Sequence, residues 1–156
     1  MTQPVTHDTF VLEREYRKPV ATVFAALADP AKKRRWFAEG EGHDLDGFDM
    51  DFRVGGAERA AYRMGAATPF PGTPLVSEGH YEDIVDDARV VMSATMSLGG
   101  RRISTAIATY ELFGEGEHTR LRFTHQAAFY EGADGPEMRR GGWEKLLDRL
   151  TAEVEA

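Results

Sequence analysis

The chain has 156 residues, of which 42% are hydrophobic, and a domain of this size can bury a substantial core without disulfides or metals. It contains no cysteine, which excludes disulfides, thiol catalysis and thiolate metal sites. The net charge of −7 argues against a nucleic-acid or anionic-membrane partner, because phosphate binding requires clustered positive charge. No segment has the pattern of a targeting signal or a membrane span, so we expect a cytoplasmic protein.

The first part of the chain predicts a tail, a strand and two short helices. Residues 1–8 are expected to be a flexible tail. The alternation of apolar and polar side chains over 10–17 is typical of a half-buried strand. Apolar residues then recur at helical spacing over 20–27. Asp29 and Pro30 indicate the end of this helix and the start of a second one that reaches Trp36.

The middle of the chain shows the alternation of β-strands. Six strands are expected, at residues 48–54, 58–64, 75–85, 89–98, 102–112 and 119–127. Short turns between them indicate antiparallel neighbours. The proline-rich segment around Phe70 is expected to form a loop, at the mouth of any cavity. Pro136 opens a last helix, and its apolar stripe from Trp143 to Val154 needs a sheet to cover.

This order of elements indicates an α+β domain, and five segments carry a family resemblance. They are RKPVATVFAALADPAKKRRWF, RVGGAER, GHYEDI, GEHTRLRFTHQ and GGWEKLLDRL. Through them the chain resembles the START-like (SRPBCC) superfamily, and within it the bacterial single-domain proteins similar to the C-terminal domain of Hsp90 ATPase activators. The resemblance implies one helix-grip (START/Bet v 1-like) domain over residues 9–156. In that fold a curved antiparallel sheet wraps around the C-terminal helix and leaves a cavity between them.

The family name also suggests a chaperone partner. In the eukaryotic activator a separate N-terminal domain supplies much of the chaperone contact, and the present sequence has no room for it. A fold shared with that activator does not by itself carry its function. We therefore do not expect this chain to activate an Hsp90-type chaperone directly.

Several side chains are candidates for contact with a ligand. His125 is the first, because alternation turns it inward and its ordinary pKa of about 6.5 would suit proton transfer. A lone inward histidine is nevertheless more often a hydrogen-bonded structural residue than a catalytic base. Arg14 also lies on an inward face and needs a carboxylate partner, for which Glu78 is the candidate. Solvation at a frayed strand end is the alternative for Arg14.

The remaining candidates are aromatic residues and methionines. Tyrosine combines an apolar ring with one polar hydroxyl, and the flexible thioether of methionine adapts to varied apolar shapes. Packing in the core is the competing interpretation for each of them. These candidates are Met50, Phe52, Tyr62, Tyr81, Met92, Met96, Tyr110, Phe123 and Trp143.

Other patterns predict no further chemistry. The basic run 32–35 is interpreted as a solvated helix face rather than a nucleic-acid site. The aspartates at 44–51 and 83–87 do not match a calcium loop, and the histidines lack zinc-site spacing, so no metal site is expected. The sequence contains no P-loop, nucleophile elbow or dinucleotide fingerprint, and we expect no cofactor.

Three functions compete at this stage. The first is binding of a small apolar or amphipathic molecule in a cavity lined by Met50, Phe52, Tyr62, Met92, Phe123 and His125. The second is a cyclase- or aromatase-like enzyme that uses His125 and a tyrosine. The third is an interaction module, either a homodimer through strand edges and the proline-rich loop or a chaperone adaptor. We favour binding without catalysis, because no complete catalytic constellation is present.

Overall fold

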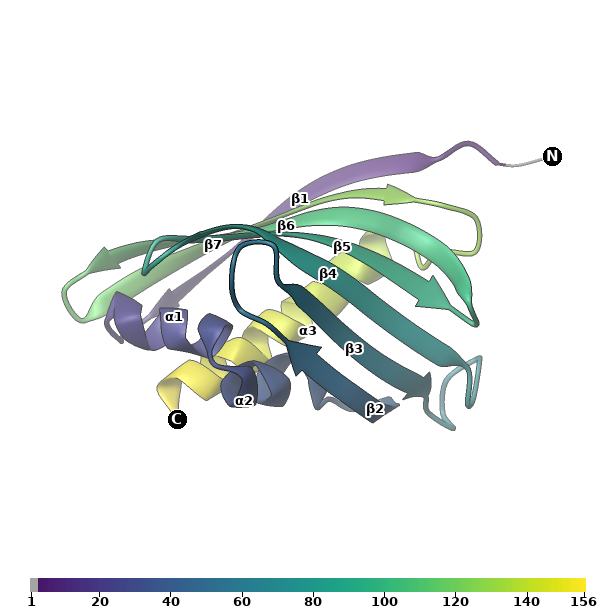
Figure 1. The fold of residues 1–156 in the computed structure, drawn as a ribbon, viewed down its shortest axis with the longest axis horizontal. Coiled ribbons are helices and arrows are strands. Elements are labelled where there is room, and N and C mark those ends of the chain that lie inside the picture. The colour runs from purple at the N-terminus through teal and green to yellow at the C-terminus, as the bar shows by residue number, and fades with distance from the viewer. Residues whose placement is uncertain (1–2) are drawn as a thin grey trace.

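The computed structural model describes residues 3–156 and folds them into a curved seven-stranded sheet around one long helix (Figure 1). All neighbouring strands are antiparallel, in the order β1-β7-β6-β5-β4-β3-β2. The predicted α+β helix-grip fold is confirmed. The strands are β1 (Thr6–Tyr16), β2 (His43–Met50), β3 (Ala57–Met64), β4 (Pro74–Val85), β5 (Arg89–Leu98), β6 (Arg101–Glu115) and β7 (His118–Phe129).

Four helical segments complete the fold. They are α1 (Val20–Ala28), α2 (Pro30–Lys33), the π-helical turn η1 (Arg34–Ala38) and α3 (Pro136–Glu155). The Asp29 carboxylate accepts a hydrogen bond from the Ala31 N–H at 2.9 Å, which explains why α2 begins at Pro30. The helical path continues two residues beyond the predicted end at Trp36. The Trp36 indole N–H donates to the Ala26 carbonyl at 2.8 Å and ties η1 to α1.

The ends of two strands differ from the prediction. Strand β1 starts at Thr6, which pairs with Phe129 of β7, so residues 6–8 belong to the sheet and not to the tail. Strand β2 runs from His43 to Met50, and the segment that follows is a turn rather than the predicted strand continuation through Val54. In this turn Gly55 adopts a left-handed φ of 85° and donates its N–H to the Tyr81 carbonyl at 2.7 Å.

The hydrophobic core fills one end of the space between the sheet and the helices. Leu147, Leu150 and Val154 on the C-terminal half of α3 are buried there together with side chains of α1 and β1. Farther toward the start of α3, the Trp143 ring packs on Phe123 of β7 with centroids 4.3 Å apart. Trp143 therefore marks the boundary between the filled end and the part of the sheet beyond it.

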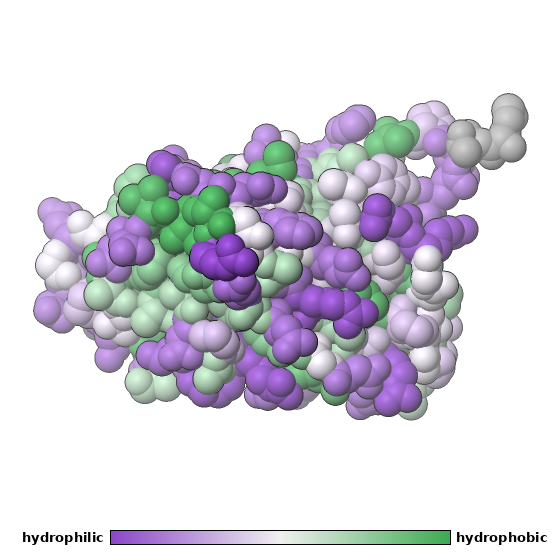
Figure 2. Space-filling model, viewed as in Figure 1, coloured by the Kyte–Doolittle hydropathy of each residue, from purple (hydrophilic) through white to green (hydrophobic). Residues whose placement is uncertain are grey.

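The surface carries mostly hydrophilic side chains on the face seen in Figure 2, with one apolar area over the end of the sheet that carries the β4–β5 turn. Val85 beside that turn is 40% exposed. Across residues 3–156, no helix is both long and apolar enough to cross a membrane. Strands β1 and β2 form the two edges of the sheet, and homodimerisation through them stays a prediction.

Candidate functional site

A cavity of about 1250 Å³ lies between the concave face of the sheet and α3, which lines it from Met138 to Arg149. Strands β3 to β7 form its floor, α3 forms its roof, and η1 with the start of β2 closes one side. The part that faces the sheet is sheltered, because its floor residues Ser104, Ala106 and Ala108 are buried. The segment at Glu41 and Asp44 is exposed and forms the rim.

The cavity exists because small side chains occupy the inward positions of the central strands. On β6 the inward residues are Ser104, Ala106 and Ala108, whereas Ile107 between them points outward and is 45% exposed. Ala94 of β5 lies opposite Ala106 and also lines the cavity. This is the reverse of the usual preference for large apolar side chains on the covered face of a sheet. The strands therefore leave room under α3 that their own side chains do not fill.

A polar group of side chains lies on the sheltered side of the cavity, and we call it the polar end: Ser104, His125, Asp134 and Arg139. The Arg139 guanidinium donates two hydrogen bonds to the Asp134 carboxylate, at 2.8 and 2.7 Å, and a third to the Ser104 hydroxyl at 2.9 Å. Arg139 is only 7% exposed and stacks over the ring of Phe129. Its charge is thus paired within the protein.

His125 is the one member of the polar end with an unsatisfied buried nitrogen. The residue is 3% exposed, and its Nδ1 has no hydrogen-bond partner among the described residues. Its ring stacks on Phe10 with centroids 4.8 Å apart. Burial, helped by the nearby Arg139 charge, lowers the pKa of His125 from 6.5 to about 4, so the imidazole is neutral at neutral pH.

The lowered pKa of His125 predicts a defined loss of stability in acid. The unfolded chain takes up a proton near pH 6.5 while the folded imidazole resists protonation until about pH 4. The free energy of unfolding should therefore be unaffected by this residue above pH 6.5. It should fall by about 3 kcal/mol in total between pH 6.5 and 4 and should not fall further below pH 4. In urea unfolding at several pH values, the His125→Gln variant should not show this decrease. Parallel curves for the native chain and His125→Gln would contradict it, and exposed His80→Gln is the matched control.

Charged side chains surround the exposed side of the cavity and form what we call the charged rim: Glu39, Glu41, Asp44, Lys145, Asp148 and Arg149. Two of these carboxylates are paired with arginines outside the lining. Glu39 accepts a hydrogen bond from Arg34 at 2.9 Å, and Asp148 accepts one from Arg14 at 3.2 Å. These exposed pairs screen the rim but contribute little to stability.

Four of the candidate residues line the cavity: Tyr62, Met96, His125 and Trp143. Tyr62 is the only tyrosine of the three candidates to do so. Its hydroxyl makes a long hydrogen bond of 3.5 Å to the Phe37 carbonyl, and its ring meets the edge of His43 at 4.4 Å. Burial raises the pKa of Tyr62, which keeps its hydroxyl protonated and available as a donor or acceptor.

Six further candidates lie in the filled end of the core and do not line the cavity: Met50, Phe52, Tyr81, Met92, Tyr110 and Phe123. They belong to one packed cluster with side chains of the helices, and Trp143 of α3 packs on Phe123 and Tyr110. Met92 and Met96 illustrate the difference, since both are on β5 and only Met96 reaches the cavity. Strand alternation identifies the face of a residue and not its position along the strand.

The expected pairing of Arg14 with Glu78 is wrong. Strand β1 lies at one edge of the sheet, and β4 is separated from it by three strands. Arg14 instead reaches α3 and pairs with Asp148. Glu78 lies on the exposed convex face, where its carboxylate is 3.4 Å from Arg59. Neither residue lines the cavity.

The basic run is not wholly a solvated helix face, because Lys33 is buried. Its Nζ lies 2.6 Å from the Glu58 carboxylate, and both side chains are almost inaccessible. Tyr81 donates its hydroxyl to the same carboxylate, and burial, reinforced by the nearby Glu58 charge, raises the pKa of Tyr81. The sequence contained a signal for Glu58, which shares the inward alternation of Ala60 and Tyr62, but it contained none for Lys33.

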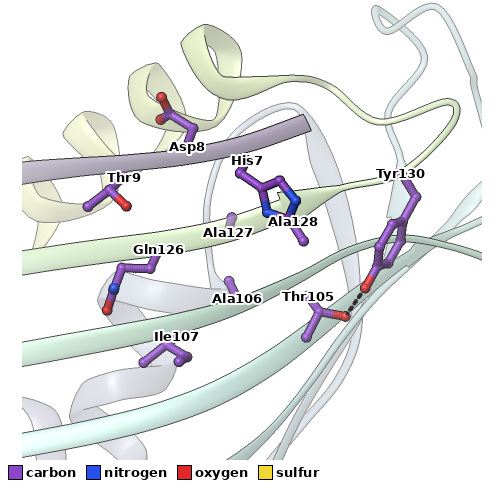
Figure 3. A pocket seen from close by; sticks show the side chains of 10 residues that line it. All are labelled: His7, Asp8, Thr9, Thr105, Ala106, Ile107, Gln126, Ala127, Ala128 and Tyr130. Atoms are coloured by element: carbon purple, nitrogen blue, oxygen red, sulfur yellow. Dashed lines mark hydrogen bonds between the residues drawn. The ribbon is translucent and has the colours of Figure 1, made fainter. Parts of the chain in front are cut away.

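A second, smaller depression of about 370 Å³ lies on β1, β6 and β7, and Figure 3 shows the side chains around it. Thr9, Ile107 and Gln126, which surround it, are exposed. The Tyr130 hydroxyl there donates to Thr105 at 2.7 Å, the hydrogen bond drawn in Figure 3. Within residues 3–156 no cluster of three or more metal-ligating side chains is present. The large cavity is therefore the candidate site.

The chain is similar to known proteins over nearly its whole length. Residues 17–155 match the family described as Activator of Hsp90 ATPase homolog 1-like protein. An uncharacterised protein from Rhizobium leguminosarum is 34% identical, with a TM-score of 0.89 and 97% of each chain covered. The Mll3558 protein from Rhizobium loti is 38% identical, with a TM-score of 0.86 and coverage of 97% of this chain and 99% of that one.

A more distant structure shares the fold alone. CalU16 from Micromonospora echinospora is 20% identical, with a TM-score of 0.61, and the comparison covers 97% of this chain and 87% of that one. No curated protein matches the chain. The fold and the family are therefore well defined by similarity, and the chemistry has to be argued from the site.

Proposed function

The chain belongs to the Activator of Hsp90 ATPase homolog 1-like family, and from this premise we propose that it binds a small hydrophobic or amphipathic molecule in the cavity between the sheet and α3. The observation that carries the proposal is the cavity itself, with its floor of small side chains and a buried histidine whose Nδ1 has no partner in the part of the chain that the structure describes. Its volume of about 1250 Å³ exceeds the roughly 300–1,000 Å³ of ordinary small-molecule sites.

The cavity lining is mostly apolar with a few polar groups, as a hydrophobic or amphipathic ligand requires. Met96, Leu146 and Trp143 provide apolar contact from opposite walls. Tryptophan supplies a large apolar surface, and the flexible methionine side chain suits ligands of irregular shape. Polar groups are few on the sheltered side and are concentrated at the polar end. Binding sites for small molecules combine an apolar lining with a small number of placed polar groups in the same way.

Binding without catalysis is favoured over an enzyme of the cyclase kind. Such an enzyme would need His125 to exchange protons with a tyrosine or a substrate near neutral pH. The pKa of His125 is lowered to about 4 and the pKa of Tyr62 is raised, so neither group changes its charge there. Among the described residues no tyrosine hydroxyl is hydrogen-bonded to Nδ1 of His125.

Native mass spectrometry of the protein isolated from its own host tests the proposal. We expect one small molecule per chain to accompany the protein and to be released on denaturation as an unmodified apolar compound. The same measurement on Ala94→Trp, in which the cavity is partly filled, should show much less of the compound. A protein that is empty in every preparation, and that stays empty when incubated with a lipid extract of its host, would contradict the proposal.

A further inference from the structure

The charges around the cavity indicate the chemical class of its ligand, and this inference rests on the proposed function. We infer that the ligand is an uncharged molecule with an apolar body and one hydroxyl or carbonyl group, which hydrogen-bonds to His125 at the polar end. Carboxylic acids and alkylamines of the same size are selected against. Three features of the lining lead to this conclusion.

The first feature is the pairing of Arg139. A buried arginine would ordinarily attract an acidic ligand, but here Asp134 already accepts two hydrogen bonds from the guanidinium and Ser104 accepts the third. A ligand carboxylate would have to separate this bidentate pair or be buried beside the Asp134 charge. Either arrangement leaves one carboxylate without its partner beside the buried Arg139, where little water is available to solvate it, and this is unfavourable.

A cationic ligand is disfavoured at the polar end for the corresponding reason, because the carboxylate that could bind it is already paired with Arg139. Asp134 is the one carboxylate at the polar end, and it is engaged with Arg139. An ammonium group placed there would lie beside the guanidinium and would lose its own hydration without gaining a free carboxylate. The polar end therefore favours neither sign of charge.

The second feature is the charge balance of the lining as a whole. Carboxylates exceed cations among the lining residues by two, since Glu39, Glu41, Asp44, Asp134 and Asp148 stand against Arg139, Lys145 and Arg149. Arg34 and Arg14, which lie outside the lining, pair with Glu39 and Asp148 and remove this excess. Counted together with Arg34 and Arg14, the charged rim has no net charge for a ligand to neutralise.

The third feature is the unsatisfied nitrogen of His125. Buried polar atoms in proteins nearly always have a hydrogen-bond partner, but the buried Nδ1 of His125 has none within residues 3–156. The residue itself is part of the cavity lining. A neutral imidazole offers one donor and one acceptor nitrogen. A ligand hydroxyl can serve either of them and a carbonyl can serve the donor, so an uncharged oxygen-bearing group completes the site.

Calorimetric titration of the full chain with decanol, decanoate and decylammonium near neutral pH tests this inference. The three ligands share one alkyl chain and differ in their head groups. We expect decanol to bind at least tenfold more tightly than either charged ligand. Decanoate or decylammonium binding as tightly as decanol would overturn the inference and leave the proposed function standing, whereas no binding of any of the three would contradict the proposed function itself.

Variants at His125 test whether the preference for an uncharged ligand arises at the polar end. His125→Phe should weaken decanol binding about three- to tenfold, the size of one net hydrogen bond, and should leave decanoate binding unchanged. His125→Gln retains a polar group and should keep most of the affinity for decanol. His80→Phe alters an exposed histidine on β4 and serves as the matched control. Equal decanol affinity in His125→Phe and the native chain would overturn the role given to His125.

Discussion

Replacing Ala94 with tryptophan is expected to weaken the binding of an apolar ligand at least tenfold while the protein stays folded. Ala94 lies on the inward face of β5 opposite Ala106, and both line the cavity. Ala94 is half-buried, because it faces open space rather than a packed neighbour. A larger side chain can therefore enter the cavity without the strain that overpacking of a filled core produces.

The Ala94→Trp variant is measured with an uncharged fluorescent probe such as N-phenylnaphthylamine, together with urea unfolding as a check on the fold. Val91→Trp is the matched control, because Val91 is on the same strand and does not line the cavity. We expect the control to bind the probe as the native chain does. Equal binding by Ala94→Trp would place the ligand outside this cavity.

Replacing Glu58 with glutamine should lower the free energy of unfolding by about 3–5 kcal/mol, because it leaves the buried Lys33 ammonium without a counter-charge. The pair is only 2.6 Å apart and is excluded from solvent. It fixes α2 against β3, and η1, which contributes Phe37 and Ala38 to the cavity wall, follows directly from α2. The variant should therefore also bind apolar ligands less tightly.

Two further variants show whether the loss of stability in Glu58→Gln comes from the unpaired buried charge. The double variant with Lys33→Met and Glu58→Gln has no buried charge and should recover most of the lost stability, since apolar replacements of a buried ion pair are often neutral. Glu78→Gln removes the partner of Arg59 in an exposed pair between β3 and β4 and should change stability by less than about 1 kcal/mol. An equal effect of Glu58→Gln and Glu78→Gln in urea unfolding would show that burial does not matter here.

Most of the sheet could be predicted because one covered face imposes a regular alternation on each strand. Strand β5 was predicted at its observed limits, from Arg89 to Leu98. Strand β2 was not, because its pairing shifts between Leu45 and Gly47 and this irregularity breaks the alternation. The apolar residues at Phe52 and Val54 continue the pattern into the turn, and the sequence alone does not mark where pairing stops.

The candidate site was only partly predictable. Alternation placed His125 on the concave face, where it is buried against Phe10. It could not separate Met96, which lines the cavity, from Met92, which α2 covers. That distinction depends on where the short helices pack along the sheet, a property of the tertiary structure. The run of small inward residues from Ser104 to Ala108 is the local signal that indicates the cavity.

The central claim, that an apolar ligand occupies the space under α3, is tested most directly by methionine methyl NMR. Met96 and Met138 line the cavity, whereas Met50, Met64 and Met92 lie elsewhere and serve as internal controls. Titration of methyl-labelled protein with decanol should shift the Met96 and Met138 signals and leave the Met64 signal in place. Shifts confined to Met50 or Met64, or no shift at saturating decanol, would contradict the account.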